Sequence, residues 1–465
     1  MYAGRDYDAA WREPLWERAY VELGGGERAR EIVDALKKLY TMYTDDLVEW
    51  YASLYDPSFG AFYCTTSGKE NEGYLPDIES TIMALRFLKS SGMLDHIEGD
   101  WRDVISDEMK SKLTAFIRRM QEPNGYFYNL LLPRESLDEH RSLARRGRDL
   151  LWCTDILKAL SESPLYDTPN GMKGSCSIPD KGAHATLSAE KDTETRASAN
   201  YPEYLESRES FLEYLNGEVD IVGKSYFYGN QLAATSSQIK ARSDTLLAEG
   251  ASYSLCDVLI DWLNERIDPV TGYWSSEPTF AGTNGYFKAV RMYNTWGYPY
   301  PEPYKAAKSV LDGILGDEPS LTNICEVYNL WSALIATKRN VELFHTGEER
   351  ERTLALIRDI MMDRGAEAIL NSYRKQAAYQ KPDGGWAHRV VGSVKTHQGN
   401  IPVGLGGEES NVDAIGKATT GLTSGIFSAF EITPVPIFCE REWKIFKEIM
   451  DKAEPVIKVS TKTYR

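Results

Sequence analysis

The sequence predicts an all-α fold in which helical hairpins repeat around a ring. Three observations predict this fold: a turn motif that recurs along the chain, apolar stripes at helical spacing beside those turns, and the lack of any long alternation of apolar and polar residues. Alternation is typical of a half-buried strand, whereas recurrence about every 3.6 residues is typical of an amphipathic helix.

The recurring turn combines a proline, a glycine and an aromatic residue two positions after the glycine. Its four copies are DPSFGAF at 56–62, QEPNGYF at 121–127, DPVTGYW at 268–274 and QKPDGGW at 380–386. Proline fixes one backbone angle and glycine tolerates unusual ones, so both favour turns. The four turn glycines are separated by 65, 147 and 112 residues. These intervals correspond to about one or two helical hairpins with their loops, as is typical of a repeat protein.

The apolar stripes predict where the helices lie. Pro76 and Asp77 can begin a helix whose apolar face consists of Ile78, Ile82, Leu85 and Leu88. The stretch before Gln121 carries one stripe made of Met109, Leu113, Phe116, Ile117 and Met120. Similar stripes occupy residues 304–315, 348–362 and 440–453. We expect a helical N-terminal extension over residues 1–45 and one ring-shaped domain over residues 46–465.

Two of the turns resemble a known motif. Lys112, Phe116, Ile117, Gln121, Gly125 and Phe127 resemble the QW motif of terpenoid cyclases, with Phe127 in place of the tryptophan, and Gln380, Gly384 and Trp386 resemble its second half. Similar turns occur across α,α-toroids, including six-hairpin glycosidases, several polysaccharide lyases and protein prenyltransferases. The resemblance implies an (α/α)6-type toroid with long loops rich in Gly, Pro and aromatic residues. It also implies that Gln380 and Trp386 tie the end of an outer helix to the next inner helix.

The composition excludes several classes of partner. The 465 residues carry a net charge of -16, which disfavours binding to nucleic acid and to anionic membranes. No apolar run is long enough to span a bilayer, and the N-terminus has no signal-peptide pattern. The six cysteines form no C-x-x-C pair, so we expect reduced thiols, a cytoplasmic location and no structural zinc. Gly404–Gly407 lacks the remainder of a phosphate loop, and no metal, nucleotide or redox cofactor is expected.

The candidate catalytic residues are carboxylates near the beginnings of predicted inner helices. They are Asp77, Glu79, Glu326, Glu409 and Asp413. Glycoside hydrolysis requires one carboxylic acid and one carboxylate on opposite sides of the scissile bond. Glu326 lies between apolar neighbours and is our candidate acid, with Asp77 or Asp413 as the base. Asp77 can also be explained as a helix cap, and Glu326 as a partnered structural acid.

The candidate substrate-binding residues are aromatic or polar and lie in the same stretches. They are Trp274, Asn284, Lys288, Tyr328, Asn329, Trp331, Trp386, His388 and Arg389. Aromatic faces beside amides and acids suit sugar rings, which have apolar C–H faces and hydroxyl edges. The other explanation of the aromatic residues is packing between hairpins. The long segment from His388 to Asp413 has no periodicity and is expected to fold over the mouth of a central cavity.

These residues favour a carbohydrate-active enzyme, most simply a glycoside hydrolase acting on a small oligosaccharide. A lyase or sugar epimerase is the first alternative, with His388 or Tyr328 as base and with Arg389 and Lys288 holding a carboxylate. A terpenoid cyclase-like enzyme is the second, although no D-x-D-D motif occurs and the D-D-x-x-E match at 45–49 fits a solvated helix face. A non-catalytic glycan-binding toroid is the third. The oligomeric state is not predicted.

Overall fold

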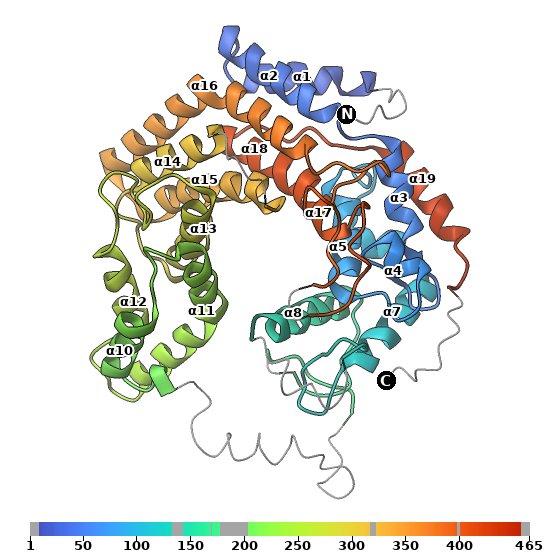
Figure 1. The fold of residues 1–465 in the computed structure, drawn as a ribbon, viewed down its shortest axis with the longest axis horizontal. Coiled ribbons are helices and arrows are strands. Elements are labelled where there is room, and N and C mark those ends of the chain that lie inside the picture. The colour runs from blue at the N-terminus through green and yellow to red at the C-terminus, as the bar shows by residue number, and fades with distance from the viewer. Residues whose placement is uncertain are drawn as a thin grey trace, which may run out of the picture.

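A computed structural model describes residues 9–132, 143–168, 170–176, 203–316, 322–397 and 400–456, and it is mostly helical. Figure 1 shows two rows of helices around the centre of the view. The inner row contains α5 (Ile78–Ser90), α8 (Leu143–Ala159), α11 (Ser225–Ala248), α13 (Phe280–Trp296), α15 (Cys325–Phe344), α17 (Val412–Gly416), the π-helical turn η4 (Lys417–Gly421) and α18 (Leu422–Phe430).

The outer row contains α3 (Asp45–Ser53), α7 (Asp107–Met120), α10 (Arg208–Glu218), α12 (Leu255–Asn264), α14 (Pro303–Leu315), α16 (Gly347–Ala377) and α19 (Glu440–Asp451). Shorter elements connect the rows: η1 (Ala10–Arg12), α4 (Thr66–Glu70), α6 (Trp101–Val104), η3 (Glu203–Leu205) and the antiparallel strands β1 (Tyr55–Asp56) and β2 (Ala61–Phe62). The helices predicted from the apolar stripes therefore correspond to α5, α7, α14, α16 and α19, and Asp77 is the N-cap of α5.

Contacts between neighbouring inner helices run around the whole row. α5 contacts α8, α8 contacts α11, α11 contacts α13, α13 contacts α15, α15 contacts α18, and α17 contacts α5 again. The outer helices α3 and α19, from opposite ends of the chain, also pack together. The beginnings of α13, α15 and α17 are thereby brought close to one another, although they lie far apart in the sequence.

The four turn glycines all have a left-handed backbone conformation, with φ between +63° and +88°. Three of them also pack directly on an outer helix. A Cβ at Gly60 would lie 2.6 Å from Met109 O of α7, one at Gly272 would lie 2.7 Å from Ala306 N of α14, and one at Gly384 would lie 2.6 Å from Asp46 Cβ of α3. Because a side chain is excluded both by the angle and by the contact, glycine is required at these positions.

The turn at 380–386 joins α16 to α17 as expected. Gln380 pairs with Trp386 in an antiparallel bridge, and the carbonyl of Trp386 accepts a hydrogen bond of 3.0 Å from the N–H of Asn411, the N-cap of α17. The corresponding Gln121 pairs with Phe127 in the same kind of bridge. Its side-chain oxygen accepts hydrogen bonds from the N–H groups of Leu165 (2.7 Å) and Tyr166 (3.1 Å), in the segment that follows α8.

The N-terminal helices α1 (Glu13–Glu22) and α2 (Gly26–Tyr40) lie outside the two rows, where α2 packs along α16. Their apolar side chains belong to the same continuous hydrophobic core as those of the inner helices. The segment after His388 lies over α4, where Val403 O accepts a hydrogen bond of 3.0 Å from the hydroxyl of Thr65. The proposed boundary between residues 45 and 46 remains a prediction.

Candidate functional site

The beginnings of inner helices bring several of the predicted residues together. Asn284 and Lys288 lie one turn apart on α13, so both side chains emerge from the same face of that helix. Asn329 of α15 donates a hydrogen bond of 3.0 Å to the side-chain oxygen of Asn284. Together with Tyr328, His388, Asp413 and Lys417, these residues form what we call the inner-helix site.

His388 is fixed between two inner helices by its backbone. Its N–H donates to Asn411 Oδ1 at 2.8 Å, and its carbonyl accepts from the N–H of Ile324 at 3.0 Å. The imidazole Nδ1 then lies 3.5 Å from Asp413 Oδ2, and the side chain of His388 remains 23% exposed. Nδ1 makes no hydrogen bond among the described residues at this distance, but a neighbouring carboxylate favours the ring orientation in which Nδ1 faces it and the other nitrogen can transfer a proton.

Asp413 also forms an ion pair with Lys417, one turn further along the chain. Burial acts to raise the pKa of Asp413, but Lys417 and His388 hold it well below its usual range, so this carboxylate stays ionised. Lys417 begins the π-helical turn η4. π-Helical turns are rare in proteins, and those that occur are often found at functional sites, because they displace side chains from regular helical positions.

Tyr328 lies against this π-helical turn, since a Cβ at Gly421 would be only 3.4 Å from Tyr328 Cδ2. Its hydroxyl interacts electrostatically with Lys417 and Asp413, and burial raises its pKa to about 12. The phenol therefore keeps its proton at neutral pH. Tyr328 and His388 both interact with Asp413, so a protonated phenol and an imidazole provide one acid and one base within the same site.

Lys288 lies within electrostatic range of three other cations. Burial, followed by the charges of Arg291, Arg148 and Lys417, lowers the pKa of Lys288 to about 8, against an opposing effect of the Cys325 thiol. Arg148 of α8 and Arg291 of α13 are exposed, and Lys417 begins η4, so these charges act on Lys288 from three parts of the inner row. Asp413 is already paired with Lys417, and the site therefore has an excess of positive charge that favours an anionic ligand.

Asp77 and Glu79 belong to a second group of charges, which we call the α5 charge cluster. It consists of Asp77, Glu79, Arg145, Asp149 and His397, all between 2% and 7% exposed. His397 Nε2 lies 3.3 Å from Asp77 Oδ1, and His397 Nδ1 lies 3.8 Å from Glu79 Oε2. Because both ring nitrogens face carboxylates, the imidazole is held in its charged form.

Arg145 of α8 completes the α5 charge cluster. Its guanidinium forms ion pairs with Glu79 and Asp149, including a hydrogen bond of 3.0 Å from Nε to Asp149 Oδ2. Asp77 additionally accepts hydrogen bonds from the N–H and the hydroxyl of Ser80, as an N-cap does. Burial acts to lower the pKa of His397, but Glu79, Cys64 and Asp77 raise it well above its usual range. Each charge thus has a buried partner of opposite sign.

Glu326 and Glu409 are both bonded to nearby backbone. Glu326 Oε1 accepts hydrogen bonds from the N–H of Thr322 (2.7 Å) and of Asn323 (3.2 Å), so this carboxylate holds the segment that precedes α15 against the first turn of the helix. Glu409 accepts from the N–H of Ser67 at 2.8 Å and from the hydroxyl of Ser393 at 3.0 Å. These contacts support the structural explanation of both acids, and their catalytic roles remain predictions.

Four of the predicted binding residues lie where ligand contact is not supported. Trp274, Trp331 and Trp386 are at most 1% exposed, and Trp386 packs edge-on against Tyr43 with 5.8 Å between ring centroids. Burial and contacts inside the core assign these tryptophans to packing, since the indole N–H of Trp274 donates to Leu263 O at 2.8 Å and that of Trp331 donates to Ser372 Oγ at 2.9 Å. Arg389 is exposed in a bridge with Gly392, and nothing in the described structure brings it to Lys288.

The prediction from sequence did not single out several charged residues. Lys417 follows Asp413 by four residues, a spacing at which opposite charges pair on a helix, so that contact was visible in the sequence. The same spacing relates Arg145 to Asp149. His397 and Arg148 gave no comparable signal, because their partners lie on other elements.

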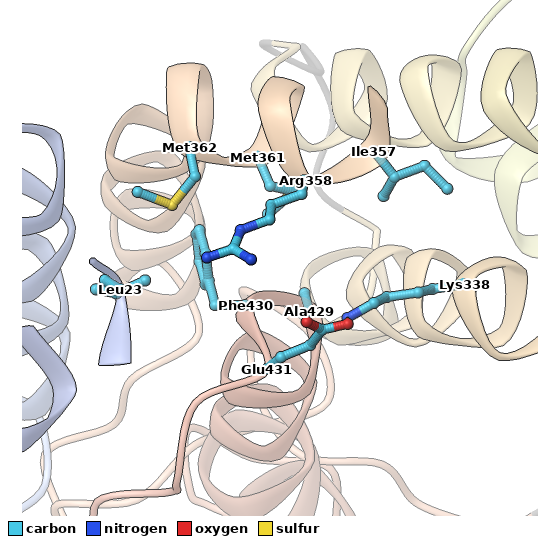
Figure 2. A pocket seen from close by; sticks show the side chains of 9 residues that line it. All are labelled: Leu23, Lys338, Ile357, Arg358, Met361, Met362, Ala429, Phe430 and Glu431. Carbon is cyan, nitrogen blue, oxygen red and sulfur yellow. The ribbon is translucent and has the colours of Figure 1, made fainter. Parts of the chain in front are cut away.

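A small pocket lies at the opposite end of α15, and Figure 2 shows the nine side chains that line it. It is mostly apolar, with an ion pair between Lys338 and Glu431. Lys338 follows Glu326 by about three helical turns, so this pocket is remote from the inner-helix site. Within the described residues, no group of three or more His, Cys, Asp or Glu side chains is placed to hold a metal ion, and no helix is both long and apolar enough to cross a bilayer.

No protein-family model matches the chain, and no curated protein or solved structure is significantly similar to it. A functional assignment therefore has to rest on the inner-helix site itself.

Proposed function

We propose that the chain is an (α/α)6-type toroid and that its inner-helix site cleaves a glycosidic bond next to a uronate by β-elimination. The toroid is supported by the contacts that run around the inner row and by Gly384, whose turn packs on the first outer helix. The function is supported above all by one observation: Lys288, within an excess of positive charge, lies in the same site as Tyr328 and the His388–Asp413 pair.

The proposed roles follow from the chemistry of elimination. A base removes the proton from the sugar carbon next to the carboxylate, a carbon–carbon double bond forms, and the bond to the leaving oxygen breaks. His388 is the base, oriented by Asp413, and Tyr328 donates its proton to the leaving oxygen. Lys288 neutralises the uronate carboxylate and thereby stabilises the negative charge that develops there. The reaction consumes no water.

Hydrolysis of an oligosaccharide is the second candidate, and one observation favours it. Glu326 Oε2 is buried and has no hydrogen-bond partner among the described residues. A carboxyl oxygen of this kind at the beginning of α15 can serve as an acid, with the ionised Asp413 as the base. In this alternative Glu326→Gln abolishes cleavage, whereas elimination by His388 and Tyr328 survives that substitution.

The first experiment is incubation of the full chain with neutral and uronate-containing oligosaccharides, followed by mass spectrometry and ultraviolet absorbance. We expect unsaturated products from uronate-containing substrates only. Tyr328→Phe should abolish them, while Tyr204→Phe, a tyrosine near the outer helix α10, should not. Saturated fragments that are formed by the wild type but not by Glu326→Gln would show hydrolysis with Glu326 as the acid, and elimination would then be wrong. If glycans bind and remain intact, the chain is a glycan-binding protein.

The compartment is also a proposal. All six cysteines are free thiols, and Cys64, Cys153 and Cys256 are buried. Free thiols are typical of a reducing compartment, which supports a cytoplasmic location.

A further inference from the structure

A close contact between α11 and α13 places an additional aromatic residue at the inner-helix site. A Cβ at Gly285 would lie 2.1 Å from the hydroxyl oxygen of Ser225, and one at Gly229 would lie 2.7 Å from the carbonyl oxygen of Gly285. The two backbones therefore touch at the beginning of α11. This contact holds Tyr226, the second residue of α11, beside Asn284 of α13.

Tyr226 is 38% exposed although it lies among the inner helices. Its ring packs edge-on against Phe280, with 5.7 Å between the centroids and 62° between the ring planes, and it forms no parallel stack with another ring among the described residues. Its hydroxyl interacts with the Asn284 amide, and with the charges of Lys417 and Arg148. Tyr226 thus borders the same group of charges as Lys288.

The amides beside Tyr226 are buried and only partly bonded. Asn284 and Asn329 are at most 2% exposed and are joined by one hydrogen bond of 3.0 Å. The side-chain oxygen of Asn329 has no hydrogen-bond partner among the described residues. A buried acceptor without a partner costs free energy, and a ligand hydroxyl that donates to it removes that cost.

We propose that Tyr226 and the Asn284–Asn329 pair form a second sugar subsite, next to the uronate position at Lys288. The exposed face of Tyr226 stacks on the apolar C–H face of a pyranose ring, and the amides bind its hydroxyl groups. Lys288 is one turn from Asn284, so the two sugars are neighbours in one oligosaccharide. This inference rests on the proposed function for the uronate, and it makes a disaccharide the smallest well-bound ligand.

The test is calorimetric titration of the full chain carrying His388→Ala, which prevents cleavage during the measurement. The probes are glucuronic acid and glucuronyl disaccharides with glucose or N-acetylglucosamine as the second sugar. Adding Tyr226→Ala should weaken disaccharide binding about tenfold, as expected for loss of one stacking contact, and change glucuronic acid binding less than twofold. Tyr226→Phe should bind like the parent, because the ring is retained. Phe227→Ala, the more exposed neighbour at 63%, is the matched control and should also bind like the parent.

The outcomes separate the subsite from the proposed function. If uronate oligosaccharides are cleaved but Tyr226→Ala binds the disaccharide like the parent, or loses affinity equally for glucuronic acid, the subsite is wrong and the function stands. If the parent binds neutral disaccharides but not uronates, and Tyr226→Ala abolishes that binding, the subsite stands and the uronate assignment is wrong. Absence of binding to every probe, without cleavage, contradicts both.

Discussion

The α5 charge cluster and the inner-helix site both consist of charged residues near the beginnings of inner helices, but they differ in exposure and in charge balance. In the α5 charge cluster every group is at most 7% exposed and contacts a group of opposite sign. In the inner-helix site His388 is 23% exposed, and Lys288 faces more cations than anions.

The difference separates charges that hold the fold from charges that are available to a ligand. Buried ions are costly to desolvate, so a closed set of partners mainly prevents destabilisation. An excess of positive charge that is partly exposed is unfavourable because the cations repel one another, and binding of an anionic ligand reduces that repulsion. We therefore expect substitutions in the α5 charge cluster to change stability, and substitutions in the inner-helix site to change activity.

The largest effect is expected for His388→Ala. Loss of the proposed base should lower kcat on a uronate oligosaccharide about 10²–10⁴-fold, with little change in the midpoint of thermal unfolding, because the backbone hydrogen bonds of residue 388 to Asn411 and Ile324 are retained and Asp413 keeps its ion pair with Lys417. His96→Ala, at an exposed histidine, is the control. A fall in stability that parallels the fall in activity would place His388 with the structural charges and remove the contrast between the two regions.

Arg145→Met should cause the largest loss of stability. The substitution leaves Asp149 buried without its cation and Glu79 with His397 alone, which costs about 3–5 kcal/mol in the free energy of unfolding, measured with urea. Arg86→Met is a matched control, because Arg86 of α5 pairs with Asp155 of α8 at 3.1 Å across the same two helices, but at the surface. That control should lose less than about 1 kcal/mol. Equal losses in both variants would show that burial does not distinguish the two pairs.

His397→Gln should remove a stabilisation that depends on pH. The folded-state pKa of His397 is raised, so its contribution is fully present below the unfolded-state pKa of about 6.5 and is lost as the pH rises through the folded-state value. We expect a difference of about 2 kcal/mol between wild type and variant near pH 6, which shrinks as the solution becomes alkaline. Urea unfolding at several pH values measures it. A constant difference, or one that grows with pH, contradicts a charged His397.

Gly384→Ala should destabilise the fold less than Arg145→Met does. It should destabilise the fold more than Gly73→Ala, a substitution at another glycine with a left-handed backbone conformation. At Gly73, with φ +86° and no atom within 4 Å of a Cβ, alanine should cost about 1 kcal/mol from the backbone angle alone. At Gly384 the contact with Asp46 of α3 adds to that cost. Thermal unfolding of the two variants compares them. Equal midpoints would mean that the turn is not packed on the first outer helix.

The sequence was sufficient for the all-α character and for the position of five helices, but not for the assignment of charges. The helices α5, α7, α14, α16 and α19 were visible in their apolar stripes, and Asp77 was recognisable as a possible cap. The carboxylates near the beginnings of inner helices have similar neighbours in the sequence whether their role is structural or functional. What distinguishes Asp77 from Asp413 is the partner that the fold supplies, His397 in one case and His388 with Lys417 in the other.

The aromatic residues show the same limit. Trp331 and Tyr328 are close in the sequence and equally suitable for sugar binding, yet Trp331 donates a hydrogen bond of 2.9 Å to Ser372 inside the core and Tyr328 borders the π-helical turn. Glu326 looked unusual because of its apolar neighbours, but Thr322, four residues earlier, provides its partner. Packing across helices, which composition does not encode, decides these roles.

Cleavage of a uronate oligosaccharide in water enriched in ¹⁸O, with products analysed by mass spectrometry, separates elimination from hydrolysis. Elimination by His388 and Tyr328 predicts unsaturated products that contain no ¹⁸O in wild type, and no products in Tyr328→Phe. Saturated products, one of which carries ¹⁸O, that still form in Tyr328→Phe would show hydrolysis and rule out elimination.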